Sequence, residues 1–284
     1  MTEGINIVGV IGAGTMGQGI AHVIAFAGYD VQLFDMEPGA TEEAMLKIKE
    51  NLQKGVEKGK LSQNQLEDVL PRITHIEQLK DIKADLVIEA IVENIEIKQK
   101  LFSYLESTLS EKAILCTNTS SISVTKIASA LQKPQRFVGM HFFNPAHIMK
   151  LVEVISASGT SEEVLSLAKD FVHSLGKKPV MAKDAPGFIV NRVARHFYVE
   201  SLRVLEEQVA SVEDIDRLVE ATGFRMGPFR LMDLIGVDTN FAVTSTMFNG
   251  FHQEPKFRPS RIQEKLVDAG HHGRKSGQGF YSYE

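Results

Sequence analysis

A glycine-rich turn between two apolar segments constrains the fold of this 284-residue chain most strongly. Residues 5–11 are apolar and rich in β-branched side chains, which predicts a buried strand, and Gly12-Ala13-Gly14-Thr15-Met16-Gly17 follows at once. Residues 20–27 carry a helical apolar pattern, and residues 31–34 predict a second strand that ends at Asp35. Since strands joined through a helix run parallel, this segment predicts the start of a doubly wound α/β sheet.

The rest of the chain predicts two domains. Further strand segments, separated by helical patterns such as 95–109, lie at 86–89, 113–116, 137–140 and 151–155. This alternation continues to about residue 180, with two consecutive helical patterns in 40–70. Beyond it, only helical patterns precede a glycine-rich, basic tail anchored by Phe280-Tyr281; they cover 188–207, 212–222 and 231–248. We predict a Rossmann-like domain over 1–186 with a helical insertion near 40–70, and an all-helical domain over 187–284.

The composition excludes several classes of protein. The net charge of −5 argues against general binding to nucleic acid or to anionic membranes. The single cysteine, Cys116, excludes an intrachain disulfide framework, and no apolar run approaches the roughly 18 residues of a membrane span. Residues 1–4 have neither the charge nor the apolar core of a signal peptide. We therefore expect a cytosolic protein.

The glycine motif has the sequence context of a dinucleotide site. Gly12 permits a tight turn, Gly14 lets the backbone approach a pyrophosphate, and Gly17 lets the helix pack closely on the sheet. Asp35 follows Gly17 after 18 residues, where it can accept hydrogen bonds from ribose hydroxyls. No Lys or Arg follows in 36–38 to accept a 2′-phosphate, so we predict NAD rather than NADP. The alternative is a simple glycine turn with a solvated acid.

A basic segment lies directly after this acid. Residues 45–60 hold five Lys against two Glu, and Lys54 and Lys58 share one helix face at i,i+4 spacing. The segment is either a solvated basic face or a site for an anionic ligand. Its place beside the predicted cofactor cleft favours the anion site.

Two polar groups follow apolar elements of the predicted fold. Asn118-Thr119-Ser120-Ser121 comes after the strand that ends at Cys116, on the carboxyl edge where open α/β sheets bind ligands. The quartet is either part of a ligand site or a cap for the next helix. Asn191, just after Pro186-Gly187-Phe188, is either a cap-related residue or a donor that reaches the cleft.

His141 ends another strand and is a candidate general base, although a lone histidine is more often structural. Glu153 lies 12 residues later within an apolar strand, and a carboxylate there needs a partner. If the intervening residues turn back, Glu153 can orient the imidazole and stabilise its charged form.

Several motifs together resemble the short-chain L-3-hydroxyacyl-CoA dehydrogenase family, most closely its 3-hydroxybutyryl-CoA dehydrogenase members. The resemblance runs from residue 5 to 283 without an obvious gap. After the glycine motif, its segments in chain order are Glu89-Ala90-Ile91-Val92-Glu93-Asn94, Asn118 to Ser121, His141-Phe142-Phe143-Asn144-Pro145, Met149-Lys150-Leu151-Val152-Glu153, Pro186-Gly187-Phe188-Ile189-Val190-Asn191-Arg192, Met226-Gly227-Pro228-Phe229 and Gly273-Arg274-Lys275-Ser276-Gly277 with Phe280-Tyr281.

The resemblance implies roles for individual residues. His141 is similar to the family's catalytic base and Glu153 to the acid paired with it. Ser120 is similar to the residue that contacts substrate and nicotinamide, and Asn191 to the partner on the carbonyl side. Positions similar to cofactor contacts are Gly12, Gly14, Thr15, Met16, Gly17, Asp35, Glu93, Lys98, Asn118, Ser120, Asn144 and Lys275. Positions similar to coenzyme A contacts are Asn51, Lys54 and Lys58. His271-His272 lack metal-ligand spacing with other ligands, so no metal is expected.

The implied activity is the reversible NAD-dependent oxidation of an (S)-3-hydroxyacyl-CoA, with 3-hydroxybutyryl-CoA and acetoacetyl-CoA as the expected pair. The family's helical C-terminal region implies a homodimer, and no nucleic acid or membrane partner is expected. A dehydrogenase of a free 3-hydroxy acid would not need the lysine-rich helix. A non-catalytic NAD-binding relative would not need the Ser120, His141, Glu153 and Asn191 set. His147 replaces the proline expected after Ala146, and we expect it to be a bystander.

Overall fold

The computed structural model describes residues 2–283, which divide into two compact units between Asp184 and Ala185. The division lies two residues before the domain boundary expected after Pro186. The end residues of the expected domains, Met1 and Glu284, lie outside the described residues. Each unit is described by itself below.

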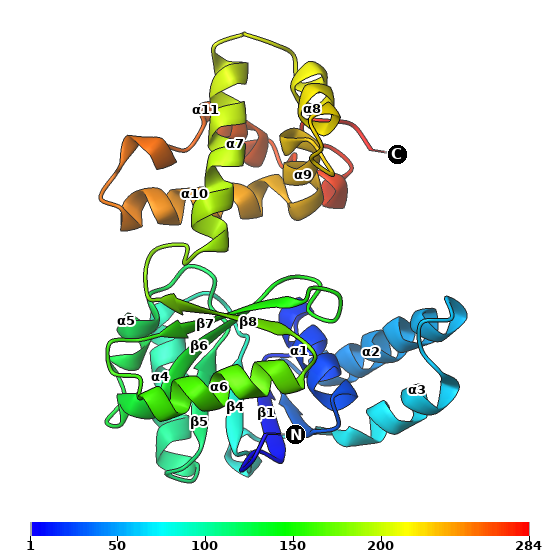
Figure 1. Cartoon of the computed structure of the whole chain (residues 1–284), viewed down its shortest axis with the longest axis vertical. Coiled ribbons are helices and arrows are strands. Elements are labelled where there is room, and N and C mark those ends of the chain that lie inside the picture. The colour runs from blue at the N-terminus through cyan, green and yellow to red at the C-terminus, as the bar shows by residue number, and fades with distance from the viewer. Residues whose placement is uncertain (1, 284) are drawn as a thin grey trace. The chain divides into compact units, whose positions relative to one another are not determined.

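The first unit is built on one sheet (Figure 1). In the described part of the chain the sheet has eight strands, in the order β3-β2-β1-β4-β5-β6-β7-β8. Neighbouring strands are parallel except for the antiparallel pair β6–β7. The strands are β1 (Ile7–Ile11), β2 (Asp30–Phe34), β3 (Ile73–His75), β4 (Leu86–Glu89), β5 (Ile114–Thr117), β6 (Phe137–Phe142), β7 (Leu151–Ser156) and β8 (Lys178–Lys183). The predicted doubly wound α/β sheet is confirmed.

Burial of the central strands explains why they appear as continuous apolar runs. All residues of β4, β5 and β6 are buried, as expected for parallel strands covered on both faces. The edge strand β8 is mostly exposed and has a lysine at each end, which disfavours pairing with another sheet. Strand order reverses between β1 and β4, so their carboxyl ends border the crevice where such folds bind ligands.

The helices of the first unit connect these strands. They are α1 (Thr15–Phe26), α2 (Ala40–Glu57), α3 (Gln63–Val69), α4 (Ile95–Thr108), α5 (Val124–Ala128) and α6 (Glu162–Ser174). The two helical patterns predicted within 40–70 are α2 and α3, which pack side by side (Figure 1). Ser62 and Gln65 form a capping box that starts α3.

The second unit is helical, as predicted, with α7 (Val190–Glu206), α8 (Val212–Ala221), α9 (Pro228–Ile235), α10 (Val237–Gly250) and α11 (Arg261–Asp268). The single helix expected over 231–248 is wrong. Gly236, with φ of 107°, separates α9 from α10, because this backbone conformation is incompatible with a continuous helix. The unit's buried apolar cluster includes Tyr198, Leu202, Ile215, Phe229 and Met232.

The C-terminal tail is anchored by a buried acid of α9. Asp233 is 1% exposed and accepts hydrogen bonds from the backbone N–H groups of Phe280 and Tyr281, both at 2.9 Å. It also accepts the hydroxyl of Tyr283. The predicted Phe280-Tyr281 anchor is therefore present. Over residues 2–283 no helix is both long enough and apolar enough to cross a membrane.

Candidate active site

The glycine turn after β1 has the shape that a dinucleotide requires. Gly12 has φ of 102°, and a Cβ there would lie 2.5 Å from the Ala90 carbonyl oxygen. A Cβ on Gly17 would lie 1.7 Å from the Gly12 carbonyl oxygen, so α1 can approach the sheet only without a side chain. Nothing lies within 4 Å of a Cβ built on Gly14, so its backbone presents an open face for a pyrophosphate.

The N-terminus of α1 adds donors to this turn. The helix begins at Thr15 with no side-chain cap and no acid in its first turn, so its first N–H groups can bind an anion. Asp35 follows β2 at the same edge of the sheet. Its two oxygens accept the backbone N–H groups of Ala13 at 2.6 Å and Glu37 at 2.9 Å, which fixes the carboxylate beside the turn. These residues fit the diphosphate and ribose of NAD.

The antiparallel pair β6–β7 places a histidine opposite an acid. His141 pairs directly with Glu153 across the two strands, so the intervening residues do turn back as hypothesised. The imidazole Nδ1 lies 2.8 Å from Glu153 Oε2, and the two residues are 6% and 1% exposed. Since an ionised carboxylate only accepts hydrogen bonds, Nδ1 carries the proton that joins them. This arrangement leaves proton transfer to the other ring nitrogen, Nε2.

The polar quartet 118–121 lies at the same edge as His141. Asn118 Oδ1 accepts the backbone N–H of Phe142 at 2.8 Å, which ties the loop after β5 to the end of β6. Glu93 accepts the backbone N–H groups of Ser120 and Ser121 at 3.3 and 3.2 Å. The alternative that the quartet caps the next helix is wrong, because Ser123 is the N-cap of α5.

Glu93 and Lys98, both expected to contact the cofactor, belong to a charged cluster under this loop. Lys98 is 1% exposed, and its Nζ lies 2.5 Å from Glu89 Oε1 and 3.2 Å from Glu93 Oε2. Partial burial alone would raise the pKa of Glu93. The Lys98 charge and hydrogen bonds from Thr119 and Ser121 outweigh it and lower that pKa below its usual value. The ammonium of Lys98 is thus enclosed by two carboxylates.

Glu89, for which no role is predicted from the sequence, is fully buried at the end of β4. A signal was available, since Glu89 ends the apolar segment 86–89 just as Glu153 lies within 151–155. An acid in an apolar strand needs a partner in both cases.

The segment after β6 carries two further predicted residues. Asn144 is exposed, as expected for a residue that meets a ligand. Lys177 is bonded to the backbone of this segment. Its Nζ donates to the carbonyls of Ala146 and Met149 at 2.6 Å each. His147 stacks on His22 with ring centroids 5.3 Å apart. Burial lowers the pKa of His147, and the charge of Lys177 adds to the effect.

Two predicted site residues belong to the second unit. Asn191 lies in the first turn of α7, and Lys275 lies in the short 3-10 helix Arg274–Ser276. Lys275 Nζ donates to Asp238 Oδ2 at 2.7 Å. Their expected approach to Ser120 and the cofactor stays a prediction. Within residues 2–283, no three or more His, Cys, Asp or Glu side chains are grouped to hold a metal ion.

The predicted coenzyme A residues lie on α2 and at its end. Lys54 and Lys58 are exposed, Asn51 is half-buried, and an ion pair between Lys47 and Glu50 at 3.0 Å offsets part of the local charge. A groove of about 380 Å³ also borders α2; it is lined by Thr41, Glu42, Met45, Leu46, Lys49, Leu70 and His75.

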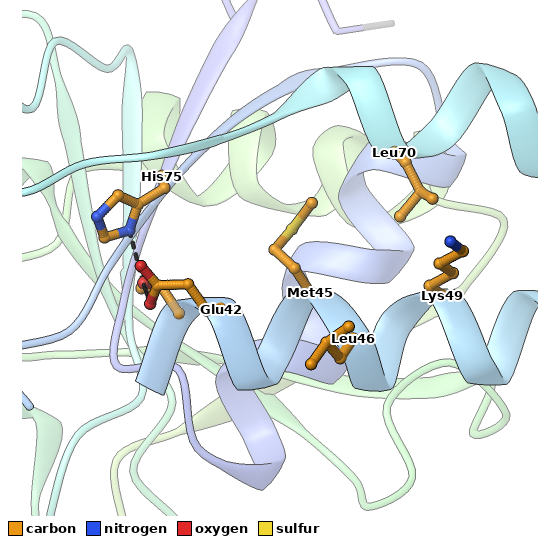
Figure 2. A pocket seen from close by; sticks show the side chains of 7 residues that line it. Glu42, Met45, Leu46, Lys49, Leu70 and His75 are labelled. Carbon is orange, nitrogen blue, oxygen red and sulfur yellow. Dashed lines mark hydrogen bonds between the residues drawn. The ribbon is translucent and has the colours of Figure 1, made fainter. Parts of the chain in front are cut away.

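Figure 2 shows His75 and Glu42 at one end of this groove and Lys49 and Leu70 at the other. The Thr41 hydroxyl bonds both His75 Nδ1, at 2.5 Å, and Glu42. At about 100° per residue, Met45 points to the opposite side of α2 from Lys54. The groove and the lysine pair are therefore separate surfaces.

Comparisons with known proteins cover both units. Residues 7–185 match the family model described as 3-hydroxyacyl-CoA dehydrogenase, NAD binding domain. Residues 187–283 match the model described as 3-hydroxyacyl-CoA dehydrogenase, C-terminal domain.

Individual relatives align along the whole chain. A protein of Escherichia coli K12 named 3-hydroxyadipyl-CoA dehydrogenase is 47% identical over all of this chain, which spans 60% of that protein's length. A 3-hydroxybutyryl-CoA dehydrogenase of Bradyrhizobium diazoefficiens is 41% identical, with 100% of this chain and 97% of the relative covered. The crystal structure of an (S)-3-hydroxybutyryl-CoA dehydrogenase from Ralstonia eutropha superimposes with a TM-score of 0.94 at 38% identity, covering 99% of each chain.

Proposed function

The chain belongs to the 3-hydroxyacyl-CoA dehydrogenase family, and we propose on that premise that it interconverts an (S)-3-hydroxyacyl-CoA and the corresponding 3-oxoacyl-CoA. Its N-terminal domain belongs to the family's NAD-binding domain, so the predicted cofactor, NAD, is confirmed. The observation that carries the proposed chemistry is the buried His141–Glu153 pair at the edge of the sheet that holds the glycine turn.

In the proposed mechanism, His141 Nε2 removes the proton of the substrate's 3-hydroxyl group while the hydrogen on C3 departs as hydride. Bound NAD+ supplies the hydride acceptor. Glu153 keeps Nδ1 protonated and stabilises the imidazolium that forms, and in the reverse direction the same proton returns to the 3-oxo oxygen. General-base help of this kind is worth about 10²–10⁴-fold in rate.

We assign Ser120 and Asn191 to the substrate oxygen, which they would hold and polarise as the carbonyl develops. The half-buried Ser120 lies in the loop that Asn118 ties to the end of β6, close in the fold to His141. Asn191 is assigned by family resemblance alone. The cofactor would be held by the glycine turn, Asp35 and the loops after β4, β5 and β6.

We propose 3-hydroxybutyryl-CoA as the substrate. The relatives from Bradyrhizobium diazoefficiens and Ralstonia eutropha, which match this chain over nearly their own full length, carry that name. A second candidate is 3-hydroxyadipyl-CoA, which the name of the 47%-identical relative favours. The coenzyme A portion would bind the surface formed by the half-buried Asn51 and the exposed Lys54 and Lys58, whose charge suits phosphate groups.

The deciding experiment follows NADH absorbance in steady state. Acetoacetyl-CoA should be reduced rapidly, and free acetoacetate should not be. Oxidation rates with 3-hydroxybutyryl-CoA and 3-hydroxyadipyl-CoA then rank the two candidate substrates by kcat/KM. Tight NADH binding without turnover of any acyl-CoA would instead support a non-catalytic protein.

We also propose a cytoplasmic homodimer that associates through the second unit. A homodimer interface on that unit would cover exposed apolar side chains, which are Val193, Val209, Leu218, Phe224, Leu234 and Ile235. The one cysteine is buried and free, which suits a reducing compartment. Light scattering across protein concentrations would measure the oligomeric state.

A further inference from the structure

Three charged side chains, of which Glu89 and Lys98 are buried and Glu93 is partly exposed, form a continuous link between β4 and the loop that carries Ser120. Glu89 ends β4, Lys98 lies one turn into α4, and Glu93 lies between them in sequence. Lys98 Nζ bridges the two carboxylates at 2.5 and 3.2 Å. Since Glu89 and Lys98 are 0% and 1% exposed, each needs the other for its charge to be buried.

Both carboxylate oxygens of Glu89 accept hydrogen bonds in this part of the fold. One oxygen accepts the backbone N–H of Ile91 at 2.8 Å together with Lys98, and the other accepts the Thr117 hydroxyl at 2.7 Å. Glu89 and Thr117 are register partners across the parallel pair β4–β5, so strand pairing sets this contact. The Thr117 oxygen in turn accepts the backbone N–H of Thr119 at 3.3 Å. Glu89 thereby reaches the loop through Thr117.

Glu93 reaches the same loop from the other side. Its Oε1 accepts the hydroxyls of Thr119 at 2.6 Å and Ser121 at 2.8 Å, in addition to the backbone N–H groups of Ser120 and Ser121. Its Oε2 faces Lys98. The ammonium therefore fixes the orientation of the carboxylate that holds the loop.

The loop is held by its backbone and by the neighbours of Ser120. Among the hydrogen bonds of the described residues, the Ser120 hydroxyl takes part in none, whereas its N–H is bonded to Glu93. The network thus fixes the position of Ser120 and leaves its hydroxyl available to a ligand.

We propose that the Glu89–Lys98 ion pair is the positioning element for Ser120, acting through Thr117 and Glu93. The proposal rests on the function proposed above and deepens it. Lys98 then acts on catalysis from beneath the loop. A displacement of reacting groups by about 1 Å costs on the order of 10²-fold in rate, so loss of this link should appear in kcat.

The test separates positioning from simple support of the fold. Breaking a buried ion pair by removing one partner destabilises a protein, whereas replacing both partners by neutral groups is often tolerated. We therefore compare Lys98→Met with the double variant Glu89→Gln/Lys98→Met. The double variant should recover much of the melting temperature lost by Lys98→Met, yet keep a kcat for acetoacetyl-CoA reduced by about 10-fold or more. Its dissociation constant for NADH should stay within about threefold of the wild type.

Arg136→Met is the matched control. Arg136 is a 6%-exposed cation that bonds the carbonyls of Ser110 and Glu106, away from the carboxyl edge, so this variant should lose stability and keep its kcat. Recovery of kcat together with stability in the double variant would overturn the proposal. So would a large rise in the NADH dissociation constant for Lys98→Met, because that result makes Lys98 a cofactor contact.

Hydrogen exchange tests the same inference without turnover. The N–H groups of Thr119, Ser120 and Ser121 should exchange with solvent faster in the double variant than in the wild type. In the Arg136→Met control, the N–H groups of β6 should stay protected from exchange. Unchanged exchange across 119–121 would overturn the proposal. If the wild type turns over no acyl-CoA and the variants still show this exchange pattern, the proposed function is refuted. The positioning network is then still supported.

Discussion

His141 and Glu153 face each other across β6 and β7, which form an antiparallel pair while the other strand pairs of the described residues are parallel, with Nδ1 and Oε2 2.8 Å apart. If the two strands were parallel, a long crossover connection would have to separate the two residues in the sequence before they could be register partners. The antiparallel return from β6 to β7 brings the acid back to the end of the strand that carries the histidine. A separation of twelve residues therefore suffices to place the imidazole against the carboxylate.

Removal of this pair should reveal that it acts as one unit. His141→Ala should lower kcat by about 10²-fold or more, because proton transfer then depends on water. Glu153→Gln should also lower kcat, because a neutral amide cannot stabilise the imidazolium. Steady-state kinetics of the double variant should show little further loss beyond His141→Ala.

His147→Ala is the control for the identity of the base. Its kcat should stay within about threefold of the wild type, since His147 stacks on His22. If the two single losses multiply in the double variant, the pairing is wrong. If His147→Ala is the crippling change, the assignment of His141 falls.

Asp35 should determine the choice of cofactor. Its carboxylate is fixed beside the glycine turn by the N–H groups of Ala13 and Glu37, where it would repel a 2′-phosphate. The wild type should prefer NADH, and Asp35→Ser should narrow the ratio of kcat/KM for NADH over NADPH by about 10-fold or more. A wild-type preference for NADPH would contradict the assignment.

The fold could be predicted from sequence wherever its signals were local. The turn at 12–17 and the apolar strands of the buried sheet are each indicated by a pattern that covers only a few residues. β3 was missed because it has three residues and two of them are exposed, so no alternation or apolar run can form. The break at Gly236 was missed because an isolated glycine within an apolar helical pattern is compatible with a continuous helix.

The site was predictable only in part for a similar reason. Glu153 stood out as an acid within an apolar strand, and the return of the chain supplied its partner. Family resemblance gave Lys98 only as a cofactor-contacting position, and its burial follows from Glu89 and Glu93, which come from outside its helix. Such burial depends on three-dimensional packing that the spacing of charges along one helix does not encode.

Lys54 and Lys58 should act on binding of the acyl-CoA more than on chemistry. The double replacement by Ala should raise KM for acetoacetyl-CoA about 10-fold and leave kcat nearly intact, as expected for binding that is uniform along the reaction. Lys47→Ala/Lys49→Ala removes the same charge from the same helix and should leave KM nearly unchanged. Equal effects of the two pairs would indicate a general electrostatic field in place of a site.

The last prediction concerns pH and the buried His22, whose ring is 6% exposed and whose Nδ1 has no hydrogen-bond partner among the described residues. Burial, followed by the charges of His147 and Lys177, lowers the pKa of His22 from 6.5 to about 4. Between these two pH values the unfolded chain binds a proton at His22 that the folded chain excludes. Stability should therefore fall as the pH decreases from 6.5 towards 4, by up to about 3 kcal/mol from this residue.

The replacement His22→Phe keeps an aromatic ring against His147 and removes the titration. Urea unfolding at several pH values should show that the stability advantage of the variant over the wild type grows as the pH decreases through this window and is constant above it. A difference in unfolding free energy that does not depend on pH would contradict the prediction.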